Sequence, residues 1–156
     1  MIHTIGYGNR KWGEFLALLH RYDITVLVDI RTSPFSRFSS AFRRSILENQ
    51  LKEAGIGYVF LGQELGGKPK DLSLYSNGKL NYDLVEAMPT YQNQILKLLE
   101  WEREGKSICL MCSEQNPNSC HRKTLVGQSL VKLKRTIIHI DENGNAQHTE
   151  KDGRLF

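Results

Sequence analysis

Short apolar runs alternate with amphipathic segments along the whole chain. Residues 25–30 are an almost uninterrupted run of aliphatic and β-branched residues, which is typical of a strand buried on both faces, and residues 107–112 form another apolar run. Residues 11–22 instead carry Phe15, Leu18, Leu19 and Tyr22 at helical spacing. The pattern predicts strands over residues 3–7, 25–30, 58–61, 107–112 and 136–140, and helices over residues 11–22, 40–54, 81–104 and 120–133.

The alternation of strands and helices predicts an α/β fold. We expect one three-layer domain over residues 1–156, with a mostly parallel sheet of about five strands and helices on both faces. Asn143-Gly144 is a typical hairpin turn, so residues 145–149 are expected to return antiparallel to the last strand. Pro89 is expected to interrupt the third helical stretch. Residues 62–78 are expected to form a polar loop.

The composition narrows the class of protein. Apolar residues make up 40% and charged residues 24% of the chain, as in soluble globular proteins. No apolar run is long enough for a membrane span, and the first residues lack a signal-peptide pattern, so we expect a cytoplasmic protein without a membrane partner. Three cysteines, an odd number, argue against a disulfide-stabilised secreted fold. The net charge of +4 favours anionic partners without requiring nucleic acid.

Glycines and reactive side chains gather where the predicted strands end. The first strand ends in Gly6-Tyr7, the second in Asp29-Ile30-Arg31 and the fourth in Cys112-Ser113-Glu114, while Gly66-Gly67 follows the third. Ligands of open α/β sheets bind beyond the carboxyl ends of the strands, which lie at one edge. The sequence therefore predicts a single site at this edge.

Asp29 has two interpretations, because an unpaired carboxylate at the end of an apolar strand would be costly to bury. It is either a structural group that caps the next loop or pairs with Arg31, or a general base that acts on a substrate. The sequence leaves both open.

The loop after the second strand interleaves cations with aromatic rings. We expect Arg31, Ser33 and Arg37 to bind an anion at the crevice, because guanidinium groups suit phosphate. Aromatic rings among cations are also suited to stacking on bases, which keeps a nucleic-acid contact open. Arg43-Arg44 is interpreted as a solvated helix face.

Residues 112–122 form the segment richest in reactive side chains. We expect the last helix to begin after Ser119 as its N-cap, with free backbone amides that favour an anion. Arg122 in its first turn would bind that anion, and Cys112 or Cys120 is a candidate nucleophile. His121 and Glu114 are candidate proton-transfer groups.

Zinc is the competing interpretation of the cysteines. Residues three apart on a strand point to opposite faces, so Cys109 and Cys112 cannot both face one metal ion. We therefore interpret Cys109 as a core residue and expect neither a metal nor a cofactor.

Several motifs together resemble domain-of-unknown-function family 488. The residues that carry the resemblance are Thr4-Ile5-Gly6-Tyr7, Val28-Asp29-Ile30-Arg31 with Ser33-Pro34, Leu65-Gly66-Gly67, Cys112-Ser113-Glu114 and Cys120-His121-Arg122. The resemblance covers nearly the whole chain, strengthens the site assignment and implies no particular reaction. A fainter similarity to rhodanese-type domains rests on the Asp-x-Arg motif and on a cysteine at the end of a later strand.

These observations lead to three hypotheses. The first is a small enzyme that acts on a phosphorylated or nucleotide-like anionic substrate. The second is a nucleic-acid-binding module in which the Arg/Phe loop makes the contacts. The third is a rhodanese-like sulfurtransferase or a thiol redox protein.

Overall fold

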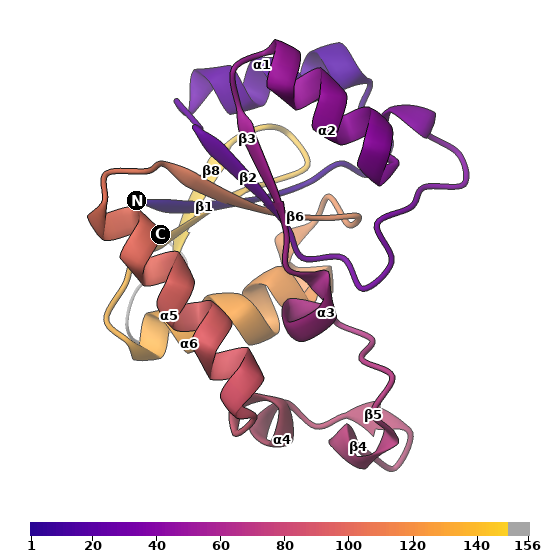
Figure 1. Ribbon diagram of the computed structural model, residues 1–156, viewed down its shortest axis with the longest axis vertical. Helices are drawn as coiled ribbons and strands as arrows, with labels where there is room; N and C mark the ends of the chain where they lie inside the picture. Colours follow the sequence, from indigo (N-terminus) through magenta and orange to yellow (C-terminus); the bar gives the residue numbers. More distant parts are fainter. Residues whose placement is uncertain (150–156) are drawn as a thin grey trace.

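A computed structural model describes residues 1–149 and shows a mixed sheet between two layers of helices (Figure 1). The sheet has six strands in the order β3-β2-β6-β1-β7-β8, and all but the last are parallel. The predicted α/β class is confirmed. The strands are β1 (Ile2–Gly6), β2 (Val26–Asp29), β3 (Gly57–Phe60), β6 (Ile108–Cys112), β7 (Ile137–Ile140) and β8 (Ala146–Thr149).

Helices cover both faces of the sheet. On one face, α1 and α2 bury Phe15, Leu19, Leu47 and Leu51. On the other face, α5 and α6 lie side by side, with the shorter α3 and α4 at their edge (Figure 1). The helices are α1 (Trp12–Arg21), α2 (Arg44–Glu53), α3 (Gly62–Leu65), α4 (Tyr82–Glu86), α5 (Pro89–Arg103) and α6 (Gln128–Lys132).

The strand order creates a topological switch point between β1 and β6. From β1 the chain passes through α1 to β2, whereas from β6 it passes through residues 122–132 to β7 on the opposite side of the sheet. The two connections pack on opposite faces, so they diverge where β1 and β6 lie side by side. Such a divergence leaves a crevice beyond the carboxyl ends of the two strands. Gly6 and Cys112, which are paired in register, end the two strands there.

Two predicted elements differ from the observed ones. The predicted helix over residues 40–54 is divided into a 3-10 turn (Ser40–Phe42) and α2, because Arg43 adopts an extended conformation that lets Phe42 enter the core against Tyr7. The predicted polar loop over residues 62–78 contains α3, a 3-10 turn (Leu72–Leu74) and a hairpin of β4 (Tyr75–Ser76) and β5 (Lys79–Leu80).

The last predicted helix also begins differently. Ser119 belongs to a 3-10 turn (Pro117–Ser119) and is not the N-cap, so that prediction is wrong. A π-helical segment (Arg122–Gly127) follows and continues into α6. Gly127 suits this wider segment, because an added Cβ would lie 2.8 Å from the carbonyl oxygen of Arg122, and 3.3 Å from Cε1 of His139 on β7. π-helical turns are rare in proteins, and those that do occur are often found at functional sites.

Other local predictions are confirmed. α4 ends before Pro89, which begins α5 at a position where its missing N–H costs nothing. The Asn143-Gly144 turn leads into β8, which pairs antiparallel with β7. None of the helices over residues 1–149 combines the length and the apolar character that crossing a membrane requires.

Two buried histidines make the stability of the fold sensitive to acid. Burial lowers the pKa of His139 to about 3 and that of His3 to about 4, whereas an unfolded histidine titrates near pH 6.5. Below that pH the unfolded chain binds more protons than the folded one, so stability falls as the pH falls. We expect each histidine to cost about 2 kcal/mol between pH 7 and pH 5.

Urea unfolding at a series of pH values measures this loss. His139→Asn is the informative variant, since an amide can still pair with Thr4, whose hydroxyl lies 2.7 Å from Nδ1 of His139. The variant should lose a large part of the pH dependence. An unchanged slope would show that His139 is not the group that titrates.

Candidate functional site

A cavity of about 500 Å³ lies at the switch point, beyond the ends of β1, β2 and β6. The sequence-predicted residues that line it are Tyr7, Arg31, Ser33, Gly67, Cys112, Glu114, Cys120 and His121. The structure thus brings eight of the thirteen predicted site residues to one cavity. Its remaining lining residues are Thr32, Phe35, Lys68, Tyr82 and Ser113.

Cys120 and His121 form a thiol–imidazole pair in this cavity. Nδ1 of His121 lies 3.6 Å from Sγ of Cys120, and Nε2 lies 3.1 Å from the carbonyl oxygen of Ile30 at the end of β2. A carbonyl oxygen only accepts hydrogen bonds, so the proton resides on Nε2 and Nδ1 faces the sulfur. In this orientation the imidazole can take the thiol proton.

The surroundings of Cys120 favour its thiolate. The neighbouring thiol of Cys112 contributes most to lowering the pKa of Cys120 to about 4; burial opposes this shift, and the hydrogen bond and charge of His121 support it. The backbone N–H of Arg122 also points to the sulfur at 3.5 Å. A thiolate is the reactive form of cysteine.

Cys112 and Cys109 differ from Cys120 in their environments. Burial, with the adjacent Cys120, raises the pKa of Cys112 well above the ordinary range, so Cys112 remains a thiol that donates toward the carbonyl oxygen of Glu114 at 3.5 Å. Cys109 is completely buried among apolar residues on the face covered by α1 and α2. Among residues 1–149, no three histidine, cysteine or acidic side chains are grouped in a way that suits a metal ion.

Asp29 forms a buried ion pair with Arg31. The Arg31 guanidinium donates two hydrogen bonds to the carboxylate, at 2.9 Å and 2.7 Å, and the Arg31 backbone N–H donates a third. The Tyr58 hydroxyl donates a fourth at 2.7 Å. Burial disfavours the charged guanidinium, but Asp29 outweighs this effect and raises the pKa of Arg31. Of the two interpretations of Asp29, the geometry favours the structural one, because its acceptor sites are occupied.

Arg122 lies behind the wall of the cavity. Its side chain is fully buried, and its guanidinium donates to the carbonyl oxygens of Gln115 at 2.6 Å and Ile140 at 3.4 Å. Arg122 does not line the cavity, whereas a residue that contacts a bound anion directly would have to line it. It ties the loop after β6 to the end of β7.

Two of the predicted glycines allow backbone segments to approach closely. A Cβ on Gly6 would lie 1.6 Å from the carbonyl oxygen of Glu114, so only glycine lets the loop after β6 cross the end of β1. A Cβ on Gly66 would lie 2.3 Å from Oγ1 of Thr32. Neither lines the cavity, so the structure supports a packing role for them rather than the predicted ligand contact.

The loop after β2 presents its aromatic rings to the surface. Phe38 is 94% exposed with the Arg37 guanidinium over its ring, and Arg37 does not line the cavity. Phe35 lines the cavity and carries Arg43 over its ring at 4.7 Å. Lys68 and Tyr82 also line the cavity and were not predicted as site residues. Lys68 directly follows Gly66-Gly67, so its position in the sequence indicates the cavity, whereas no local pattern marks Tyr82.

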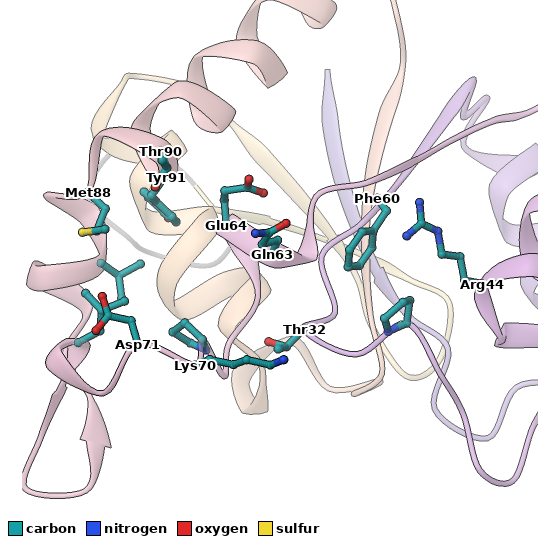
Figure 2. Close-up of a pocket in the computed structure, with 14 residues that line it drawn as sticks. Thr32, Arg44, Phe60, Gln63, Glu64, Lys70, Asp71, Met88, Thr90 and Tyr91 are labelled. Carbon is teal, nitrogen blue, oxygen red and sulfur yellow. The ribbon is translucent and has the colours of Figure 1, made fainter.

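A second cavity of about 570 Å³ adjoins the first and shares Thr32 with it (Figure 2). Figure 2 shows Arg44 beside Phe60 at one end and Met88 with Tyr91 at the other, while Lys70 extends toward Thr32 between them. None of the predicted site residues lines it. Its lining residues come from the loop after β2, from α2, β3, α3 and α5, and from the segments around α4. Among the motifs of the sequence, only Ser33-Pro34 and Arg43-Arg44 contribute to it.

The Asp29–Arg31 ion pair leads to a prediction for the variant Asp29→Asn. The substitution leaves the buried Arg31 guanidinium without a counter-charge, which should lower the free energy of unfolding by about 3–5 kcal/mol. Tyr58→Phe, the matched control, removes one hydrogen bond to the same carboxylate and should cost about 1 kcal/mol. Urea unfolding measures both. A stable Asp29→Asn variant that loses thiol reactivity would instead support the general-base interpretation.

Comparison with known proteins supports the family resemblance that the sequence motifs indicated. A family model described as "Domain of unknown function DUF488" matches residues 11–128, which is more than half of the chain. The searches of curated proteins and of solved structures gave no significant match. The matched range includes Asp29, Cys112 and Cys120-His121-Arg122, and so most of the cavity described above. This chain therefore belongs to the DUF488 family.

Proposed function

We propose that the protein is a thiol-dependent enzyme in which Cys120 is the nucleophile and His121 accepts its proton. The observation that carries the proposal is the position of the Cys120 sulfur at the cavity, between Nδ1 of His121, the thiol of Cys112 and the backbone N–H of Arg122. Nucleophile and base lie within contact of each other, and a third group, the Ile30 carbonyl, orients the base. This arrangement is the general signature of an activated nucleophile.

The substrate we propose is a phosphorylated or nucleotide-like anion. Lys68 lines the cavity beside Arg31, whose charge Asp29 already neutralises, and the chain carries a net charge of +4. Glu114 lines the same cavity and is exposed, which suits a proton-transfer or hydroxyl-binding role beside the anion. The adjoining cavity has room for the part of the substrate that does not react.

The reaction proceeds by group transfer to sulfur. The Cys120 thiolate attacks the electrophilic atom, and a bond to sulfur forms as the bond to the leaving group breaks. The imidazolium of His121, which holds the thiol proton, donates it to the leaving group. A water molecule or a second acceptor then takes the group from Cys120 and regenerates the thiolate.

The adjacent Cys112 favours a second candidate, sulfur transfer or thiol redox chemistry. The Cys120 thiolate would attack the sulfane sulfur of a donor anion and become a persulfide, as the bond between that sulfur and the rest of the donor breaks and the remainder leaves with the electron pair. The Cys112 thiol would attack the Cys120 sulfur, release hydrosulfide and leave a disulfide, which a thiol reductant then reopens. Cys112 is essential in this route, whereas in the first route its loss would only slow the reaction, so Cys112→Ser distinguishes the two.

The exposed Phe38 favours a third candidate, binding of single-stranded nucleic acid by the loop after β2. Bases would stack on Phe38 and Phe35 while Arg37 and Arg43 neutralise phosphates. Fluorescence anisotropy with a labelled oligonucleotide tests this. Binding should weaken steeply between about 50 and 200 mM salt and should fall several-fold in Phe38→Ala. Absence of binding at low salt would exclude this candidate.

Selective alkylation tests the proposed nucleophile. At pH 6, iodoacetamide should modify Cys120 first, because a thiol with ordinary pKa is almost wholly protonated there and a thiolate is not. Intact-mass spectrometry with peptide mapping identifies the modified residue. We expect Cys120→Ser to abolish the fast reaction and Cys112→Ser to retain it, slowed because the neighbouring thiol is lost.

Cys109→Ser is the matched control, since this cysteine is buried in the core away from the cavity. Its removal should leave the fast alkylation unchanged. Equal, slow modification of the cysteines at pH 6 in the wild-type protein would contradict the proposal. His121→Gln should also slow the reaction at pH 6, and an unchanged rate in that variant would remove His121 from the mechanism.

A further inference from the structure

Arg122 is a buried cation without a buried acid. Its side chain has no exposed surface, and a guanidinium does not lose its proton in proteins. In residues 1–149, no carboxylate lies within ion-pair distance of it, whereas the other buried arginine at the site, Arg31, is paired with Asp29. Burying a charge without a counter-charge costs several kcal/mol (about 3–5 where a partner is removed).

The hydrogen bonds of Arg122 satisfy only part of its guanidinium. Nη2 donates to two backbone carbonyl oxygens, but Nε and Nη1 have no hydrogen-bond partner among the described residues. The buried guanidinium therefore keeps its net charge, and two of its three nitrogen atoms have no acceptor among the described residues. A second buried arginine, Arg10, donates to the carbonyl oxygens of Gly6 and Asp141. Burial and the charge of Arg122 lower the pKa of Arg10, and the carboxylates of Asp141 and Glu14 oppose this shift.

The thiols of Cys112 and Cys120 are the cavity groups near Arg122 that can become negative. The buried carboxylate of Asp141, next to Ile140, instead accepts from Asn143, Asn145 and Gln147 and forms no ion pair with Arg122. The Arg122 backbone N–H donates to Sγ of Cys120 at 3.5 Å, and Gln115, held by the guanidinium, lies in the loop that connects the two cysteines. The charge of Arg122 lowers the pKa of Cys112 and of Cys109, although burial outweighs it and keeps both protonated, so this charge reaches the thiol pair through Cys112. In a buried region such a charge acts strongly, because little water screens it.

We propose that Arg122 is a positioning residue whose buried guanidinium is the counter-charge of the single thiolate that the Cys112–Cys120 pair carries on Cys120. This inference rests on the proposed nucleophilic function. The positive charge makes one negative charge on the thiol pair favourable, and the hydrogen bond to Gln115 holds the loop so that both sulfurs face the cavity. Arg122 acts through the thiols and does not touch the substrate, which accounts for its position behind the cavity wall.

The pH dependence of Cys120 alkylation tests the inference. In Arg122→Met the midpoint of the rate profile should rise by at least one pH unit, and in Arg122→Lys, which keeps the charge, it should rise by less than half of that. Arg10→Met is the matched control: it removes a buried cation whose guanidinium bonds to carbonyls at the ends of β1 and β7, and the midpoint should stay within a few tenths of a unit. A midpoint in Arg122→Met equal to that of the wild type overturns the inference.

A second measurement covers the case in which Arg122→Met does not fold. Cys112→Ser/Cys120→Ser removes both possible thiolates and leaves the guanidinium without a counter-charge. Adding Arg122→Met to this double variant should then raise the urea midpoint. A triple variant that fails to fold, or has a lower midpoint than the double variant, would show that Arg122 serves the backbone alone and would overturn the inference.

Failure of the inference is distinguishable from failure of the proposed function. A wild-type midpoint in the range of an ordinary cysteine contradicts the function itself. A low wild-type midpoint that Arg122→Met does not move leaves the nucleophile intact and removes only the role of Arg122.

Discussion

The guanidinium of Arg122 cannot lose its charge and lies completely buried at the end of the sheet, so the surrounding chain must supply acceptors for it. The carbonyl oxygens of Gln115 and Ile140 do so, and they belong to the loop after β6 and to β7. These bonds hold the cysteine loop against the sheet, where Gly6 lets it cross the end of β1. The positions of Cys112 and Cys120 follow from this constraint.

The two buried arginines of the site, Arg31 and Arg122, have different roles. Arg31 is neutralised by Asp29 and lies over the Tyr7 ring at 5.3 Å, so it builds the wall of the cavity with little net charge. Arg122 has no acid partner among the described residues. The same residue type thus serves packing in one case and, in our proposal, electrostatic support of a thiolate in the other. Whether a carboxylate lies within ion-pair distance of the guanidinium decides which of these two roles the arginine has.

The sequence predicted those elements of the fold that depend on a local residue pattern. Apolar runs identified the central strands, and Asn143-Gly144 identified the final hairpin. The same dipeptide occurs at Asn77-Gly78, where both residues have positive φ, but the strands it joins are only two residues long and carry no alternating pattern, so the sequence predicted a loop at the β4–β5 hairpin. Arg122 was placed in the cavity because an ordinary helix was assumed, whereas a π-helical segment directs its side chain beneath the wall. The second cavity depends on side chains from distant segments, which no local pattern brings together.

The central claim is that the Cys112–Cys120 pair carries one negative charge, on Cys120. The most direct measurement is an NMR titration of protein labelled with ¹³C at cysteine Cβ, because this shift reports ionisation of each thiol separately. We predict that Cys120 shows the shift of a thiolate at neutral pH and titrates only in acid, while Cys112 and Cys109 keep the shift of a protonated thiol. Three protonated cysteines at neutral pH, each ionising in the ordinary alkaline range, would contradict the account.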